Sequence, residues 1–492
     1  MTSLLFDESN LAPLLPTSSL SEHPEKRTAP AKTINYFNLS MIVYFSIGGG
    51  PFGYEESILV TNPAWAFWTL FFVSTCWALP QSLTLAEMSV RYPGGYNEWV
   101  YRAYNYHVGY FHSLVRSFFG ILCYVAYVTL FYDYINTLYH DLNVLKYADY
   151  SPFYFCLKTL TLLVLLSLLV LVNLLGTKRL SRFGSVLAFI VLTPFIVLFI
   201  ILIVQHKWSL HQLTDFTIMT EHPSIARMIS IIMFNLMGWD FVGSVTEQAK
   251  KPKRDVPLGM LLALGLVIIT YVIPTLDLIF TFDFSKNPND RDSPYNVKEP
   301  LYFVMAKKTF EPLGFVIIIA TFCSMFGLSA MFLQTSSQAL VHASDFKFVP
   351  QVFGTTTNGV PLFALLFQSV MSFFIALFVT FDMVVSLQMW VLSVSTIIIM
   401  LGYLIIRWKD FVYKRKIRSK FYLPVHPLVL TFFVFPTIGF SMFELVYKEG
   451  EWIIIFIGIA ILVFCELVTL TVLYYRRRNV TVINSDVLVK EL

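Results

Sequence analysis

Residues 48–56 read GGGPFGYEE and lie inside an apolar segment that begins near Phe37. Four glycines in this run weaken a helix, and Pro51 removes a backbone donor and clashes with the preceding turn. In a bilayer, backbone without helical hydrogen bonds is tolerated only where it faces protein or a water-filled cavity. The run therefore predicts a membrane-spanning helix that is interrupted part-way across.

Two carboxylates, Glu55 and Glu56, follow this break directly. A helix broken near mid-membrane and followed by acids is typical of a binding site in a transport protein. The alternative is a proline kink whose two glutamates lie at the outer interface, where negative charge stabilises the start of the next helix. The stretch on its own leaves both interpretations open.

The whole composition indicates a protein embedded in the membrane. Of 492 residues, 56% are hydrophobic and 13% are charged, whereas soluble proteins carry about 25% charged residues. We expect a disordered cytoplasmic segment at 1–35, one all-α domain of twelve membrane helices at 36–475 and a cytoplasmic tail at 476–492. Each span needs roughly 20 residues, and the expected limits are 37–60 (broken), 64–88, 107–138, 153–174, 183–205, 225–247, 257–281, 312–341, 361–380, 383–406, 428–447 and 452–475.

The distribution of positive charge predicts the orientation. With the N-terminus inside, the inner segments hold 24 lysines and arginines and the outer segments hold 10, with Arg116 inside a span. Because basic residues favour the cytoplasmic side, we expect both termini to be cytoplasmic. None of the five cysteines has metal-ligand spacing, so we expect no metal and no cofactor. The expected partners are the lipid bilayer and a small molecule, with no nucleic acid, and the oligomeric state is left open.

A second break is expected in the sixth span, at Gly238-Trp239-Asp240. Spans one and six are each the first member of a group of five, and five is odd, so the second group crosses the membrane in the opposite sense. Breaks at corresponding places in two halves point to an inverted-repeat transporter with its substrate at the midplane. The ends of half-helices offer amide donors and carbonyl acceptors, and an amino acid has a group for each.

The polar and aromatic residues near this second break allow more than one interpretation. Asp240 is costly at this depth, which favours a function, although a hydroxyl or Arg116 could pair with it as a structural partner. Arg116 lies near the inner end of its span and could instead extend to the interface. An aromatic gate or cage could be formed by Trp239, Phe234, Tyr127 and Trp390, but aromatic residues also simply pack.

Five stretches carry a resemblance to a known family. They are the GGGPFGYEE run, residues 86–100 (AEMSVRYPGGYNEWV), 172–178 (VNLLGTK), 238–257 and 348–361. Together they resemble the amino acid–polyamine–organocation (APC) superfamily, and most closely its polyamine-uptake and L-type-like branch. The resemblance implies a LeuT-like 5+5 inverted repeat with two extra helices, and secondary transport of an amino acid or polyamine, usually with protons.

The resemblance also implies roles for particular residues. Backbone at the first break would contact the substrate, Phe234 would be an aromatic gate, and the acidic positions after the breaks would fall on Asp240 and on Glu55 and Glu56. The full set of expected substrate-binding residues is Gly48, Gly49, Gly50, Gly53, Glu55, Glu56, Tyr127, Phe234, Gly238, Trp239 and Asp240.

One position departs from the polyamine branch. Asp133-Tyr134 resembles its acidic-aromatic pair on the third span, and Tyr127 matches a tyrosine, but the mid-span acid falls on Cys123. A polyamine carries several amines and needs several acids along its path, so this loss weakens the assignment of a polyamine substrate.

We therefore expect a proton-coupled importer of amino acids or polyamines, biased to cationic substrates, that works by alternating access in the plasma membrane. Asp240 or Glu56 would be the buried acid that carries the proton. The alternative is a sensor of the same fold that binds an amino acid without transport and signals through 1–35 and 476–492. An enzyme is not expected, because the histidines are scattered rather than clustered with cysteines and acids.

Overall fold

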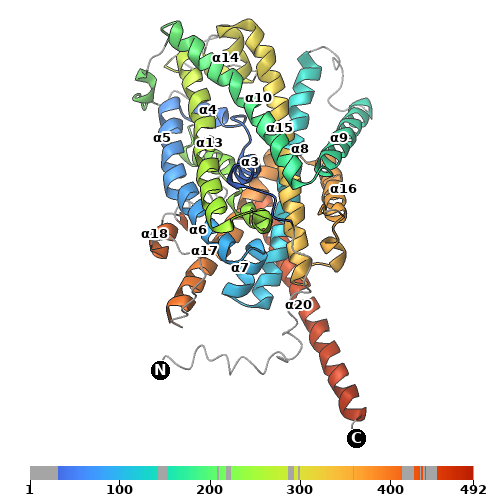
Figure 1. The fold of residues 1–492 in the computed structure, drawn as a ribbon. Coiled ribbons are helices and arrows are strands. Elements are labelled where there is room, and N and C mark those ends of the chain that lie inside the picture. Colours follow the sequence, from blue (N-terminus) through green and yellow to red (C-terminus); the bar gives the residue numbers. More distant parts are fainter. Residues whose placement is uncertain are drawn as a thin grey trace.

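The computed structural model describes residues 31–141, 152–207, 210–217, 223–285, 293–296, 300–357, 359–379, 381–412, 426–432, 434–435, 438 and 452–490. Within these ranges the regular structure is helical, apart from two isolated β-bridges. Figure 1 shows the helices as one elongated bundle, most of them running along its length. The expectation of an all-α membrane protein is confirmed.

Long apolar helices make up most of the bundle. In the described part of the chain, 8 helical segments are long and apolar enough to cross a bilayer. One of them, Arg227–Gln248, contains the expected second break. The other seven belong to α8 (Tyr106–Asp141), α9 (Pro152–Asn173), α10 (Thr177–Val204), α13 (Pro252–Thr281), α15 (Glu311–Asp345), α17 (Phe381–Val412) and α20 (Trp452–Lys490).

Several of the twelve expected spans correspond to shorter or composite helices. Residues 63–91 are helical throughout, as α5 (Pro63–Val73), the π-helical turn η2 (Ser74–Ala78) and α6 (Leu79–Arg91). The expected ninth span is α16 (Leu362–Phe378), and the eleventh, 428–447, lies mostly outside the described residues, which include α18 (Pro427–Phe432). The remaining short helices are α7 (Gly95–Ala103), η3 (His211–Leu213), η6 (Pro294–Asn296), α14 (Leu301–Thr309) and η7 (Gln351–Gly354).

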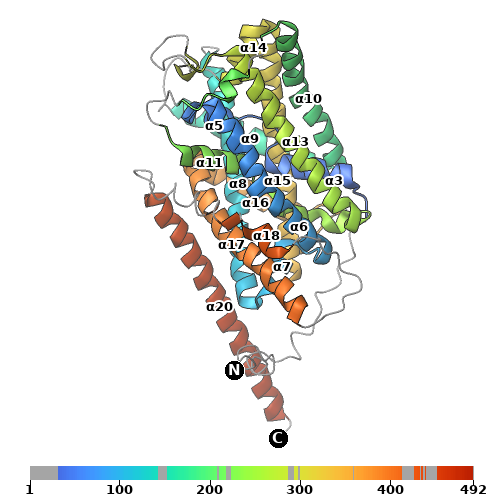
Figure 2. The same cartoon turned by 90° about the vertical axis from the view of Figure 1, so that its left-hand side faces the viewer.

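Burial separates the helices into an inner and an outer group. α8 and the segment with the second break are mostly buried, whereas α9 and α20 expose most of their apolar side chains. Phe189 on α10 and Phe456 on α20 are examples, at 73% and 68% exposed. Such surfaces are stable in lipid but not in water, so the outer group faces the bilayer. Figure 2 shows α20 along one side of the bundle and extending beyond it.

The two terminal segments differ in part from expectation. Most of the segment 1–35 lies outside the described residues, but Ile34 is fully buried and forms a parallel bridge with Ala249. The amides of Thr33 and Ile34 both donate to the carbonyl of Gln248, at 3.0 Å each. The end of the segment expected to be disordered is therefore fixed to the chain that follows the second break. At the other terminus, α20 continues as a helix to Lys490.

Candidate functional site

The first expected break is present. α3 (Tyr36–Ile47) ends one residue before Gly48, and α4 (Glu55–Val60) begins at Glu55. Between them the chain is not helical, and Gly49 and Gly53 have φ angles of +63° and +89°. The carbon that a side chain on Gly50 would add would overlap Ser324 of α15, whose buried hydroxyl has no hydrogen-bond partner among the described residues. The break therefore leaves backbone and an unused hydroxyl together inside the bundle.

The second break is also present, three residues long. α11 (Ile225–Asn235) ends at Asn235, and the short helical turns η4 (Trp239–Phe241), α12 (Val242–Val245) and η5 (Thr246–Gln248) follow. Gly238, between them, has a φ of +106°, in the left-handed region that favours glycine. Its conformation turns the chain from one half-helix into the other.

The two breaks touch each other. A Cβ atom on Gly238 would lie 2.4 Å from the carbonyl oxygen of Ser46, and one on Gly48 would lie 2.4 Å from the hydroxyl of Tyr271 on α13. That hydroxyl donates to the carbonyl of Asn235 at 2.9 Å. It therefore provides a hydrogen-bond donor for the last carbonyl of α11 while it packs against the first break. We call residues 46–48, 235–238 and Tyr271 the break junction. Tyr271 was not predicted, because a tyrosine in an apolar span carries no sign of its long-range partner.

Glu55, rather than Glu56, is the buried acid after the first break. Glu55 is 6% exposed and its Oε2 accepts from the amide of Gly53 at 2.8 Å, whereas Glu56 is exposed. Consecutive residues of a helix point about 100° apart, so only one of the two can turn back toward the break. The expected burial of Glu56 is corrected here. Glu55 forms no ion pair within the part of the chain that the structure describes.

Asp240 is paired with Arg116. This pairing is one of the alternatives that the sequence left open. The guanidinium is fully buried, forms an ion pair with the carboxylate, and lies 4.3 Å from the ring centre of Phe119 and 5.1 Å from that of Phe241. Arg116 therefore does not extend to the membrane interface. Because a buried charge needs a partner, each member of the pair stabilises the other, and Asp240 does not offer an uncompensated negative charge.

Buried aromatic rings line the α8 side of the second break. Arg116, Phe119, Cys123 and Tyr127 follow each other at helical spacing, so they share one face of α8. The ring of Phe332 on α15 packs against both Tyr127 and Phe241, with ring centres 5.2 and 4.7 Å apart. The Tyr127 hydroxyl is buried and has no hydrogen-bond partner among the described residues. It is thus a polar group available inside the bundle.

The other expected aromatic residues have different surroundings. Trp239 is fully buried and its indole donates to the carbonyl of Leu236 at 2.6 Å. This hydrogen bond lies within the second break and links its two sides. Phe234, in the last turn of α11, is partly buried. Trp390 packs against Gly458 of α20, so it belongs to the contact between α17 and the outer helix. A single cage of all four aromatic residues is not formed.

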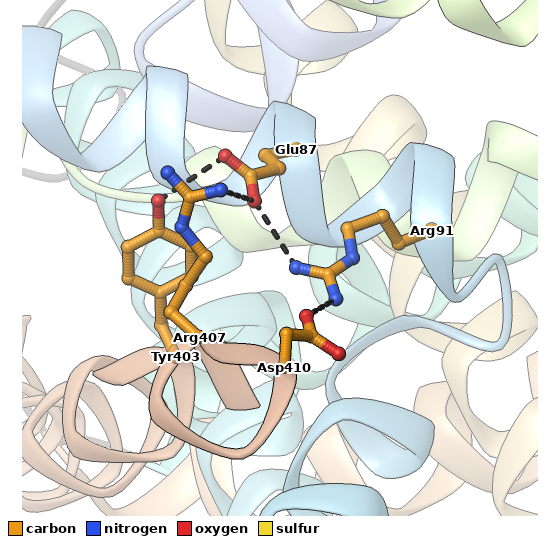
Figure 3. Close-up of polar contacts among 5 residues, drawn as sticks. All are labelled: Glu87, Arg91, Tyr403, Arg407 and Asp410. Atoms are coloured by element: carbon orange, nitrogen blue, oxygen red, sulfur yellow. Dashed lines mark hydrogen bonds and ion pairs between the residues drawn. The ribbon is translucent and has the colours of Figure 1, made fainter. Parts of the chain in front are cut away.

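A second polar cluster joins α6 to α17. Figure 3 shows Glu87 and Arg91 from α6 beside Tyr403, Arg407 and Asp410 from α17. Arg91 pairs with Glu87 at 3.1 Å and with Asp410, while Glu87 also accepts from Tyr403 at 3.2 Å and pairs with Arg407 at 3.3 Å. Both side chains from α6 are fully buried in this network. We call these five residues the inner polar network, because they lie at the end of the bundle that the charge distribution predicts to be cytoplasmic.

A bundle of membrane helices that contains two interrupted helices in contact defines a class of membrane transport proteins. The family model "Amino acid permease" matches residues 34–465, which is most of the chain. The chain therefore belongs to the amino acid permease family, within the APC superfamily that it resembles. The family consists of permeases rather than enzymes, and the chain is a multi-pass integral membrane protein.

Similar proteins include plant transporters. The chain is 25% identical over 257 residues to polyamine transporter RMV1 of Arabidopsis thaliana, covering 51% of this chain and 50% of that protein. It is 23% identical over 248 residues to polyamine transporter PUT1 of Oryza sativa subsp. japonica, covering 50% and 44%. Cationic amino acid transporter 5 of Arabidopsis thaliana is 23% identical over 235 residues, with 46% and 38% covered. The matched regions span 38% to 50% of the length of these relatives.

Proposed function

We propose that the protein is a secondary active transporter of cationic small molecules, either polyamines or cationic amino acids. Two observations carry the proposal: the two interrupted helices meet at the break junction, and the buried carboxylate of Glu55 accepts from the Gly53 amide of the first break without an ion pair among the described residues. The names of the similar proteins support the same two substrate classes. The charge of Asp240 is already compensated by Arg116, so we assign the substrate ammonium to Glu55.

The rest of the binding site follows the sequence expectations. Backbone at Gly48, Gly49, Gly50 and Gly53 offers polar groups to the substrate. Because Gly238 has no side chain, it allows the second break to pack closely against the first. The unused hydroxyls of Tyr127 and Ser324 are further candidate donors, while Phe234 and Trp239 close the site. We retain Asp240 as a residue that shapes the site through its pair with Arg116.

We further propose twelve spans arranged as a 5+5 inverted repeat with two extra helices, cytoplasmic termini, and alternating access in the plasma membrane. In this arrangement α3–α4 and α11–α12 are equivalent broken helices of the two halves. Uptake would be coupled to protons, with Glu55 in the role first given to Glu56. A carboxyl group that is buried when no cation is bound is stable in its neutral form, so it can exchange a proton for the substrate.

Uptake into proteoliposomes tests this proposal directly. The full chain is reconstituted and supplied with labelled putrescine, arginine or leucine, with and without an inward proton gradient. We expect putrescine or arginine to accumulate faster with the gradient, and leucine to enter more slowly than either. If none of the three enters, transport is refuted, and a ligand that raises the melting temperature without entering would support the sensor. Uptake at the same rate with and without the proton gradient would refute proton coupling but not transport.

A further inference from the structure

A cavity lies between two loops that the proposed binding site does not include. It has a volume of about 500 Å³. One wall is formed by Leu174, Leu175 and Gly176 in the turn before α10 and by Arg179 in the first turn of α10, and the other by Thr357 and Val360 before α16 and by Leu362 at its start. The two loops meet here, because a Cβ on Gly176 would lie 3.9 Å from Val360. The volume is within the range of small-molecule sites.

The wall formed by α10 is held in place by the core. Thr177, the first residue of α10, accepts from the side-chain amide of Gln334 on α15 at 2.9 Å. Asn173, the last residue of α9, donates to the carbonyl of Ala330 on the same helix at 3.1 Å. These buried contacts fix the turn from α9 into α10, which forms one wall of the cavity.

The chain segments that form the cavity carry positive charge and no negative charge. Arg179 lines it, and Lys178 and Arg182 lie in the same first turns of α10. From residue 150 to 214, and again from 346 to 381, the sequence contains no aspartate or glutamate. The amino end of a helix also favours an anion. An anionic ligand would therefore be attracted to the wall of the cavity that α10 forms.

The surroundings of the cavity are apolar and exposed. Leu174 and Leu175 are 45% and 46% exposed, Leu171 before them is 59% exposed, and Leu362 across the cavity is 40% exposed. In a membrane protein such side chains contact acyl chains. The combination of a basic residue in a cavity with apolar walls at its edge matches a phosphate group that is attached to hydrocarbon tails.

We propose that this cavity is a binding site for an anionic phospholipid, with the headgroup phosphate at Arg179 and the acyl chains along the leucines of α9 and α16. Clusters of basic residues beside membrane helices attract anionic headgroups. Here the attraction is concentrated at the cavity, so we expect the lipid to prefer this position over the other basic residues on that face.

Native mass spectrometry of the full chain in detergent tests the site. Bound lipid is counted while phosphatidylglycerol, or phosphatidylcholine with the same acyl chains, is added. We expect tight binding of at least one phosphatidylglycerol and weaker binding of phosphatidylcholine. The variant Arg179→Gln should bind phosphatidylglycerol about five-fold more weakly, the effect of roughly one basic residue at an anionic surface.

A matched variant separates the cavity from general surface charge. Lys253→Gln removes an exposed lysine at the start of α13, outside the cavity, and should leave binding unchanged. Equal losses in both variants would overturn the proposal, as would equal binding of the two lipids. Inorganic phosphate or glycerol phosphate that binds as tightly as the lipid would instead show a soluble ligand and refute the lipid. Melting temperatures without added lipid confirm that both variants fold.

Discussion

Gly238 is the residue at which the two broken helices come closest. Alanine there would place its Cβ 2.4 Å from a backbone carbonyl, in a left-handed conformation at φ +106°. The backbone conformation alone costs of order 1–3 kcal/mol for a residue other than glycine, and the carbonyl cannot rotate away as a flexible side chain could. We predict that Gly238→Ala lowers the melting temperature of the purified protein and abolishes uptake.

A glycine in an open position provides the control for this substitution. A Cβ on Gly265, inside α13, would meet no atom within 4 Å. Alanine is favoured over glycine in a helix by up to about 1 kcal/mol, so Gly265→Ala should leave the protein as stable or more stable. Full activity of Gly238→Ala would contradict the close contact between the breaks.

The neighbouring residues Glu55 and Glu56 allow a direct comparison of a buried and an exposed acid. Glu55 is buried against the first break and Glu56 is exposed on the other side of the same turn. We predict that Glu55→Gln reduces uptake of a cationic substrate at least about tenfold, since a lost charged hydrogen bond is worth roughly 1.5–3 kcal/mol. Glu56→Gln should stay close to the wild-type rate in the same assay. The reverse order would contradict the assignment of the substrate ammonium to Glu55 and point to Glu56 instead.

The Arg116–Asp240 pair predicts a non-additive result. Removing one partner leaves the other charged and buried, which costs about 3–5 kcal/mol. Arg116→Gln and Asp240→Asn should therefore each lower the melting temperature strongly, while the double variant should be less destabilised than the sum of the two. Additive losses would show that the ions are not coupled. The melting curves need no transport assay.

At the scale of single residues, the sequence predicts the two breaks, but only some of the residues that contact them. Glycines and Pro51 locate the first break because their backbone effects are local. Which glutamate is buried depends on the rotation of α4 after an irregular segment, and no local rule determines that angle. The sequence offers Arg116 of α8 as one of two alternative partners of Asp240, and the packed structure selects it. Tyr271 of α13, which contacts Gly48, is identified only by the packed structure.

Among the helices, α6 and α17 are joined by the inner polar network. Arg91 is fully buried between two acids, so Arg91→Ala leaves Asp410 without this partner. We expect a loss of about 3–5 kcal/mol, seen as a large drop in melting temperature. The ion pair of Arg102 with Glu98, with Arg102 51% exposed, is the matched control, and Arg102→Ala should cost less than about 1 kcal/mol. If the two variants lowered the melting temperature by similar amounts, burial would not be the reason that the Arg91 pair matters.

Helix positions were predicted well where apolar runs are long. The limits of α8, α9, α15 and α16 lie within a few residues of the expected spans. α10 and α13 begin about one turn or more before their predicted limits, because Thr177 and Pro252 start helices whose first turns are polar and basic. Hydropathy detects only the part of a helix that crosses lipid, so such polar ends are missed.

For the whole molecule, the distribution of basic residues predicts which face is inside. We expect Lys253→Cys, in a variant whose natural cysteines are replaced by serine or alanine, to react with an impermeant maleimide only after cells are permeabilised. Phe310→Cys, at an exposed position just before α15, should react in intact cells. The opposite pattern would invert the proposed orientation and move both termini outside.

The bridge between Ile34 and Ala249 has a mechanical consequence. The chain entering the first broken helix is bonded to the chain leaving the second one, and the same two segments also touch at Gly48 and Gly238. Two points of attachment oppose a rotation of one segment about the other. If transport opens a path through the protein as proposed, we expect the two broken helices to move together, with the hinges in the chain on either side of them.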